Sequence, residues 1–181
     1  MRDSADLRRD AKLLFTAEQV GRALDDMAGR IDAELNEQLP VVLAIMNGGV
    51  FVATELCRRL RIPFEFDYVH ATRYGHSTTG RNIEWRVPPH SGLRGRVVLV
   101  VDDVLDRGIT LSALIERLED IRVAALYTAV LARKNLRESV VRPDVDFIGL
   151  ETGDLYLIGC GMDYRGLWRG LPAIYGVGPT T

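Results

Sequence analysis

The chain has 181 residues, of which 47% are hydrophobic and 27% are charged, and its formal net charge is −2. This balance fits one folded domain over residues 1–181 and excludes an intrinsically disordered chain. The near-neutral charge provides no basic surface for nucleic acid. No stretch approaches the ~18 apolar residues of a membrane helix, and the charged N-terminus lacks the apolar run of a leader. We therefore expect a cytoplasmic protein with no membrane or nucleic-acid partner.

The first part of the chain predicts a helix, a buried strand and a second helix. Thr16 and Gln19 fit a capping box, and the apolar residues that follow recur at helical spacing. Residues 41–46 form a continuous apolar run that is typical of a strand buried on both faces. Asn47-Gly48-Gly49 breaks this run, and residues 50–60 resume the helical spacing.

The middle and the end of the chain repeat this alternation of strand and helix. Residues 64–72 alternate like a strand, whereas residues 75–89 lose all periodicity and predict a long loop. A second buried strand is expected at residues 97–101, and a helix at residues 110–118. Further strands are expected at residues 124–131, 147–150 and 156–158.

Strands that alternate with helices predict an α/β fold with a mainly parallel sheet, which binds ligands at the carboxyl ends of its strands. Both glycine turns fall at such ends. Residues 176–181 are expected to be a frayed tail. Cys57 and Cys160 lie in apolar segments without metal-ligand spacing, so we expect buried free thiols rather than a disulfide or a zinc site.

The stretch VVLVVDDVLDRGITL, residues 97–111, carries the chemistry. At a strand-to-helix turn, the backbone N–H groups and the helix dipole form a concave anion site, which Gly108 lets an anion approach closely. Thr110 can add a hydroxyl, and Asp102 and Asp103 lie where they could hold ribose hydroxyls or a hydrated magnesium ion. The alternative is that Asp106 or Thr110 only caps the helix and that the acidic pair is solvated.

This stretch resembles the 5-phosphoribosyl-1-pyrophosphate (PRPP) signature of the type I phosphoribosyltransferases. The resemblance runs from about Val41 to Val177 and looks closest to the hypoxanthine-guanine branch of purine salvage enzymes. It implies an α/β fold in which helices flank a mainly parallel central sheet, with a small hood formed from N- and C-terminal segments. It also implies a PRPP site made by Asn47, Gly48, Gly49, Asp102, Asp103, Asp106, Arg107, Gly108, Ile109, Thr110 and Arg169.

Two other segments resemble loops of the same family. Met46-Asn47-Gly48-Gly49 is similar to its first phosphate loop, where an often cis, non-proline peptide presents backbone N–H to pyrophosphate; the alternative is an ordinary glycine turn. Arg73 and Tyr74 resemble the start of the flexible loop that closes over the active site. Alternatively, Tyr74 packs at a loop root and Arg73 is a solvated charge.

The resemblance places the purine at two further segments. Lys134 is similar to the lysine that donates to the 6-oxygen of the base and so favours 6-oxopurines; the alternatives are a surface lysine, or a shift by one position to Arg133. Tyr156 would stack on the base and the main chain of Leu157 would meet its edge. Without the family, Tyr156 would be assigned to the core, and Asp163 and Arg169 to the solvated surface.

The resemblance also implies the reaction, in which purine N9 attacks the anomeric carbon of PRPP with inversion and yields a purine nucleoside monophosphate, IMP or GMP, and pyrophosphate. Asp106 would act near purine N7 as general acid and base. Mg²⁺ would be coordinated by Asp163, and by Asp102 and Asp103 through ribose hydroxyls or water. Together with Arg169 it would neutralise the departing pyrophosphate. The family suggests a homodimer or homotetramer.

The chain departs from the family pattern at two positions. Arg107 stands where close relatives have a small hydroxyl residue, and Asn47 where they often have Lys or Arg. Two rival functions remain, namely a xanthine-preferring phosphoribosyltransferase and a non-catalytic regulator that senses PRPP or nucleotides with the same fold.

Overall fold

The computed structural model describes residues 11–73, 83–136 and 140–178. Its elements follow in the order β1 (Lys12–Phe15), α2 (Ala17–Glu34), β2 (Val41–Met46), α3 (Gly49–Cys57), β3 (Glu65–Arg73), β4 (Ile83–Val87), η2 (Ser91–Leu93), β5 (Val97–Leu105), α4 (Ile109–Ile121), β6 (Ala125–Asn135), β7 (Phe147–Gly153), β8 (Tyr156–Ile158) and β9 (Ile174–Val177). In the part of the chain so described, no helix is long and apolar enough to cross a membrane.

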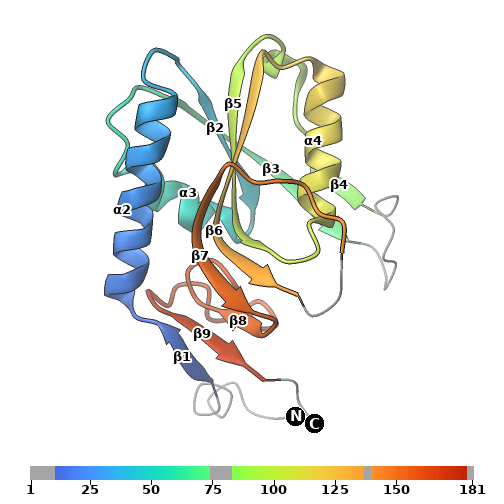
Figure 1. Cartoon of the computed structure of the whole chain (residues 1–181). Coiled ribbons are helices and arrows are strands. Elements are labelled where there is room, and N and C mark those ends of the chain that lie inside the picture. Colours follow the sequence, from blue (N-terminus) through green and yellow to red (C-terminus); the bar gives the residue numbers. More distant parts are fainter. Residues whose placement is uncertain (1–10, 74–82, 137–139, 179–181) are drawn as a thin grey trace.

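The centre of the molecule is a six-stranded sheet with the order β4-β3-β2-β5-β6-β7 (Figure 1). Strands β3, β2, β5, β6 and β7 run parallel, and β4 pairs antiparallel with β3 at one edge. Helices α2 and α3 lie on one face of the sheet and α4 lies on the other. The predicted α/β fold with a mainly parallel, helix-flanked sheet is therefore confirmed.

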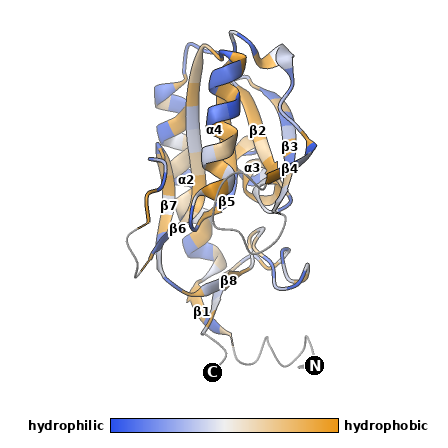
Figure 2. Ribbon diagram, turned by 90° about the vertical axis from the view of Figure 1, so that its right-hand side faces the viewer, coloured by the Kyte–Doolittle hydropathy of each residue, from blue (hydrophilic) through white to orange (hydrophobic). Residues whose placement is uncertain are grey.

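The apolar run of β5 explains why this strand lies inside the sheet. Leu99 and Val101 pack into the core beneath α2 and α3, whereas Val98 and Val100 pack into the core beneath α4. Each of these side chains is fully buried. Successive strand residues point to opposite faces, so a strand covered by helices on both sides must be apolar at every position. Figure 2 shows this hydrophobic interior between the more hydrophilic outer faces of the helices.

Helix α2 begins at the predicted capping box. The backbone N–H of Gln19 donates to Thr16 Oγ1 over 3.2 Å, and the Thr16 N–H donates to Gln19 Oε1 over 2.9 Å. These reciprocal bonds satisfy backbone groups that the first helical turn leaves without intrahelical partners. The helix then lies along β7, where the Arg30 guanidinium donates to the Ile148 carbonyl over 2.8 Å.

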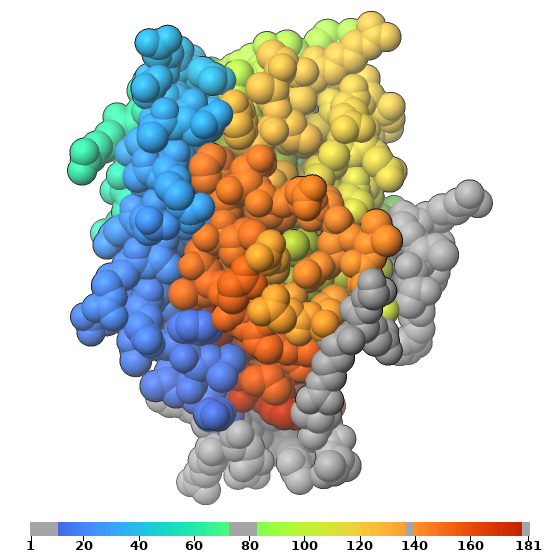
Figure 3. Space-filling model, in the orientation of Figure 1, coloured from blue at the N-terminus to red at the C-terminus, as the bar shows by residue number. Residues whose placement is uncertain are grey.

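A second, three-stranded antiparallel sheet, β1-β9-β8, forms the hood that was expected from the two ends of the chain. Figure 3 shows the N-terminal blue segment beside the C-terminal red one. The prediction of a frayed tail from residue 176 is wrong for its first two residues, because Gly176 and Val177 pair with β1 and β8. Gly176 lies where an added Cβ would be 2.9 Å from both Leu14 and Leu155, so β9 packs tightly here. Residues 179–181 lie outside the described part.

Strand β4 also corrects a prediction, because it lies inside the expected loop at residues 75–89. Ile83, Trp85 and Val87 alternate with exposed Glu84 and Arg86, which is the pattern of a half-buried edge strand. Such a short alternation between polar segments is hard to separate from loop sequence. Helix α3 ends at residue 57, three residues earlier than the predicted end at residue 60.

Candidate functional site

A cavity of about 300 Å³ opens at the carboxyl ends of β2, β5 and β6, beneath the hood. This is the edge of a parallel sheet at which ligands are expected. The cavity gathers predicted residues from the phosphate loops, the acidic strand end and the purine segment. They are Asn47, Gly48, Asp102, Asp103, Asp106, Thr110, Lys134, Tyr156, Leu157, Asp163 and Arg169.

The turn between β5 and α4 has the concave shape that its sequence predicts. Strand β5 continues to Leu105, beyond the expected end at residue 101, so Asp102 and Asp103 lie within the strand and the turn is confined to residues 106–108. Gly108 adopts the left-handed conformation with φ of 72° and caps α4. A small hollow of about 30 Å³ forms at this turn, lined in part by Asp106, Gly108 and Thr110. Backbone N–H groups and the dipole of α4 make this hollow suited to an anion.

The other residues of the predicted PRPP set do not line the main cavity. Ile109 starts α4, and Arg107 is exposed at the turn. Gly49 starts α3 against the backbone of β5, where an added Cβ would lie 2.5 Å from the Val101 carbonyl oxygen. Only glycine permits this approach of helix to strand.

The first phosphate loop lies directly over Asp103. The peptide between Met46 and Asn47 is cis, as the resemblance predicts. A Cβ at Gly48 would lie 1.8 Å from Asp103 Oδ2, and one at Gly161 would lie 2.3 Å from the Gly48 carbonyl oxygen. Burial under these two backbones raises the pKa of Asp103 above its ordinary value, although hydrogen bonds with Asp102 and Val104 oppose the shift.

Lys134 and Asp106 meet at the wall of the cavity. Lys134 Nζ lies 3.0 Å from Asp106 Oδ2, and only 10% of the lysine side chain is exposed. The neighbouring Arg133 points elsewhere and pairs with Glu151 on β7. Adjacent strand residues face opposite ways, so the site contains the lysine and not the arginine.

Tyr156 stands at the hood side of the cavity and is 49% exposed, so it is a cavity residue rather than the core residue of the alternative assignment. Its ring meets that of Tyr164 edge-on at 5.6 Å between centroids. Burial, together with the charge of Asp163, raises the pKa of Tyr156. Leu157 is buried behind it. The Tyr156 ring is therefore held by Tyr164 and remains half exposed, so it can stack on a flat ligand.

Asp163 and Arg169 line the same cavity and form an ion pair. Arg169 Nη2 lies 2.6 Å from Asp163 Oδ1, and Arg169 also donates to the Gly161 carbonyl. Asp163 is held further by the N–H of Gly166. These contacts order a carboxylate and a guanidinium side by side at the mouth, whereas the alternative assignment made them solvated surface ions.

The sequence did not single out Arg142, which lies between β6 and β7. Its Nη1 donates to the carbonyl oxygens of Asp106 and Lys134. No motif marks this arginine, since it stands in the segment 136–146, where acidic and basic residues follow one another without a regular spacing. Arg73 ends β3, and the predicted loop residue Tyr74 lies outside the described residues.

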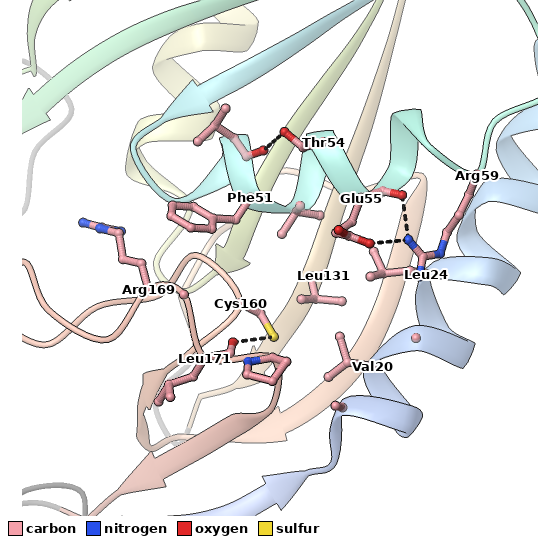
Figure 4. Close-up of a pocket in the computed structure, with 16 residues that line it drawn as sticks. Val20, Leu24, Phe51, Thr54, Glu55, Arg59, Leu131, Cys160, Arg169 and Leu171 are labelled. Carbon is pink, nitrogen blue, oxygen red and sulfur yellow. Dashed lines mark hydrogen bonds and ion pairs between the residues drawn. The ribbon is translucent and has the colours of Figure 1, made fainter.

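A larger cavity of about 490 Å³ lies between α2, α3 and the segment Cys160 to Pro172 (Figure 4). Its wall is mainly apolar, and Glu55 within it pairs with Arg59. Arg169 lines both cavities. We assign the chemistry to the smaller cavity, because that one collects the acidic, basic and backbone groups that can bind a charged ligand.

The two cysteines are free thiols, as expected, but both are only partly buried. Burial raises the pKa of Cys57 to about 11 and that of Cys160 to about 12, so neither is a reactive thiolate near neutral pH. Within residues 11–73, 83–136 and 140–178, no three or more His, Cys, Asp or Glu side chains cluster to hold a metal ion by themselves.

Comparison with known proteins agrees with this site. The phosphoribosyl transferase domain model matches residues 11–165. The hypoxanthine-guanine phosphoribosyltransferase of Mycobacterium avium is 30% identical over 171 residues, which cover 90% of this chain and 83% of that protein. The hypoxanthine-guanine-xanthine phosphoribosyltransferase of Tritrichomonas foetus is 26% identical over 163 residues, which cover 90% and 89%.

The fold leads to the same group of proteins. The solved hypoxanthine phosphoribosyltransferase of Trypanosoma cruzi, a variant complexed with the product IMP, superposes with a TM-score of 0.84 at 27% identity, covering 93% of this chain and 91% of that one. The domain match spans both phosphate loops, Lys134 and Asp163. The chain therefore belongs to the phosphoribosyltransferase family.

Proposed function

We propose that this protein is a purine salvage enzyme that transfers 5-phosphoribose from PRPP to hypoxanthine or guanine, giving IMP or GMP and pyrophosphate. The observation that carries this proposal is the 3.0 Å pair of Lys134 Nζ and Asp106 Oδ2 at the wall of the cavity. O6 and N7 lie side by side on one edge of a 6-oxopurine. The Lys134 ammonium can donate to O6 while the Asp106 carboxylate accepts from a protonated N7.

The same pair disfavours 6-aminopurines. Adenine presents an N–H donor at position 6, which would face the three N–H donors of Lys134 and find no acceptor there. The lysine is 10% exposed, so water compensates poorly for a bond that is not formed. Tyr156 would stack on the base, and the main chain of Leu157 would meet its edge.

PRPP would occupy the rest of the cavity and the hollow beside it. The backbone of residues 106–110 and the hydroxyl of Thr110 would hold the 5′-phosphate, with Arg107 at its outer side. Asp102 and Asp103 would bind the ribose hydroxyls, and the backbone of Asn47, Gly48 and Gly49 would bind the pyrophosphate. The support is the closeness of the two loops, since Gly48 lies directly on Asp103.

Asp106 would take the proton from N7 as N9 attacks the anomeric carbon of PRPP. The bond from N9 to that carbon forms while the bond from the carbon to the pyrophosphate oxygen breaks, with inversion. Lys134, 3.0 Å away, would stabilise charge on O6 and hold the Asp106 carboxylate in place. Arg169 would neutralise part of the charge on the departing pyrophosphate as a planar multidentate donor.

We propose Mg²⁺ as the cofactor, with Asp163 as its protein ligand and Asp102 and Asp103 acting through ribose hydroxyls or water. Carboxylate oxygens at the cavity suit this hard cation, which usually takes one or two carboxylates with substrate phosphates and water. When bound, Mg²⁺ would supply positive charge to the leaving pyrophosphate.

A panel of bases tests the proposal. Purified protein with Mg²⁺ and PRPP is given hypoxanthine, guanine, xanthine, adenine or uracil, and pyrophosphate release is measured. We expect turnover with hypoxanthine and guanine and much less with adenine and uracil. A xanthine-preferring enzyme is the second candidate, because one relative is named for all three 6-oxopurines; the highest kcat/KM on xanthine would favour it. Binding of PRPP without turnover on any base would favour a non-catalytic regulator.

We propose a single phosphoribosyltransferase domain over residues 1–181, a homodimer or homotetramer, and a cytoplasmic location. Light scattering of the purified chain measures the oligomer directly, and a monomer at micromolar concentration would contradict the second of these.

A further inference from the structure

We infer that Arg142 is a positioning residue that fixes Asp106 and Lys134 at the spacing needed to meet the base. This inference rests on the proposed function and adds a residue to its machinery. Arg142 lines neither the main cavity nor the hollow at the turn. It would therefore act through the two residues whose backbone it binds.

Within the part of the chain that the structure describes, the hydrogen bonds of Arg142 go to those two residues. Its Nη1 donates to the Asp106 carbonyl oxygen over 3.1 Å and to the Lys134 carbonyl oxygen over 2.7 Å. The side chains of the same two residues meet at 3.0 Å. Asp106 and Lys134 are thus joined twice, once directly through their side chains and once through a single guanidinium nitrogen on their main chain.

The position of these carbonyls explains why a bridge is needed. Strands β5 and β6 pair in register up to Leu105 and Arg133, which are the last partners of that ladder. Asp106 and Lys134 are the next residues on each side, where β5 turns away into the phosphate turn while β6 continues beside β7. Beyond the last pair the two strands share no ladder bond to hold them together. The two hydrogen bonds from Arg142, which lies outside the sheet, hold Asp106 and Lys134 together in place of a ladder bond.

A second contact links the same segment to the phosphate turn. A Cβ added at Gly108 would lie 2.8 Å from Pro143 Cδ and 3.5 Å from Arg142 Cβ. Residues 142 and 143 therefore pack against the backbone that would hold the 5′-phosphate. The segment between β6 and β7 thus packs against Gly108 of the turn, and its Arg142 donates to the carbonyl oxygen of Asp106, the first residue of the turn.

The chemistry of arginine suits this role. A planar guanidinium gives directed bonds with little loss of side-chain freedom, whereas an ammonium is a point donor on a flexible stem. Hydrogen bonds from a charged group are stronger than neutral ones. Because the bonded atoms are carbonyl oxygens and not the reacting carboxylate, the effect on catalysis must be geometric.

The test compares Arg142→Met and Arg142→Lys with wild type and with Arg133→Met, whose arginine is partly exposed and pairs with Glu151 outside the cavity. For Arg142→Met we expect the KM for hypoxanthine to rise about ten- to hundredfold, the loss of a charged bond at a positioned pair. The KM for PRPP should rise less, by up to about threefold, because Arg142 also bonds the first residue of the phosphate turn. The Tm should change by no more than about 2 °C. Arg142→Lys should recover part of the loss, and Arg133→Met should match wild type.

A second arm shows whether Arg142 acts through Lys134. In a Lys134→Met background, Arg142→Met should raise the KM for hypoxanthine by a smaller factor than it does in wild type, because only Asp106 of the positioned pair remains. Additive losses, equal losses for hypoxanthine and PRPP with a lower Tm, or unchanged kinetics in Arg142→Met would each overturn the inference. An inactive wild type would instead refute the proposed function, and the inference with it.

Discussion

Gly48 leaves no space for a side chain above Asp103, since a Cβ there would lie 1.8 Å from Asp103 Oδ2. The first phosphate loop and the acidic strand end are therefore one packed unit, although 54 residues separate them in the chain. Gly161 completes this unit from the hood side, where its Cβ would meet the Gly48 carbonyl. Substitutions in one loop should thus be felt in the other.

Gly48→Ala should destabilise the protein and abolish most activity. Its φ of −68° is ordinary for alanine, so the cost is steric, and overpacking of this kind amounts to about 1–3 kcal/mol. Thermal unfolding and pyrophosphate release measure both effects. Gly21→Ala is the matched control: nothing lies within 4 Å of its Cβ position in α2, and alanine should stabilise that helix by ~0.5–1 kcal/mol. Equal behaviour of the two variants would contradict the packing argument.

Asp103→Asn should raise thermal stability at pH 7 while lowering activity. Burial raises the pKa of Asp103 above its value in the unfolded chain, so the folded state favours the protonated form. Stability linked to this carboxyl is complete below the unfolded pKa and is lost as pH rises through the folded pKa. Asparagine carries no charge and avoids that loss.

We expect the Tm of Asp103→Asn to exceed that of wild type by about 2–4 °C at pH 7, equivalent to ~1 kcal/mol for a chain of this size. The difference should shrink as the pH falls toward the pKa of Asp103 in the unfolded chain, ~3.9, and vanish below it, where Asp103 is protonated in both states. The measurement is thermal unfolding across this pH range in the presence of EDTA. A Tm difference between the variant and wild type that stays constant with pH would show that the Asp103 carboxyl has the same pKa in the folded and unfolded states.

Lys134→Met should remove the preference for 6-oxopurines. The buried ammonium is the proposed donor to O6, and its loss should lower kcat/KM for hypoxanthine by about a hundredfold, while PRPP binding changes little. Lys12→Met, at the only other lysine of the chain, alters an exposed residue of β1 and serves as control. Steady-state kinetics with both substrates varied gives the result. If kcat/KM for PRPP fell a hundredfold and that for hypoxanthine did not, Lys134 would be assigned to PRPP binding instead.

Asp106→Asn should lower kcat by about 10²- to 10⁴-fold, the range of a lost general acid or base. The amide keeps the size of the side chain and can still accept from Lys134, so the KM for PRPP should be nearly unchanged. Asp120→Asn, at an exposed position near the end of α4, is the matched control. Turnover near wild type in Asp106→Asn would refute the proton-transfer role.

Continuous apolar runs and turn residues made most of the central sheet predictable. The run at Val97 and the capping box at Thr16 each define one element by local chemistry, and the structure has both. The short edge strand β4 was missed because its five residues alternate between polar segments. Strand β9 was missed because pairing on both sides, and not its composition, orders Gly176.

The candidate site was predictable where backbone chemistry dictates residue type. Glycines and acidic residues at a strand-to-helix turn indicate an anion site from the sequence alone. The structure places Asp103 and Lys134 at one cavity. Arg142 could not be found this way, since its partners are carbonyl oxygens that every residue carries. The larger cavity of Figure 4 was also invisible in the sequence, because its lining comes from segments far apart in the chain.

The pairing of the hood strands sets an order of events during synthesis. Strand β8, which carries Tyr156, is held by β9, and β9 in turn by β1 at the other end of the chain. A chain that leaves the ribosome N-terminus first can complete the six-stranded sheet once β7 has emerged. The aromatic platform must wait for residues 174–177, so a nascent chain acquires its phosphate turn before it can discriminate between bases.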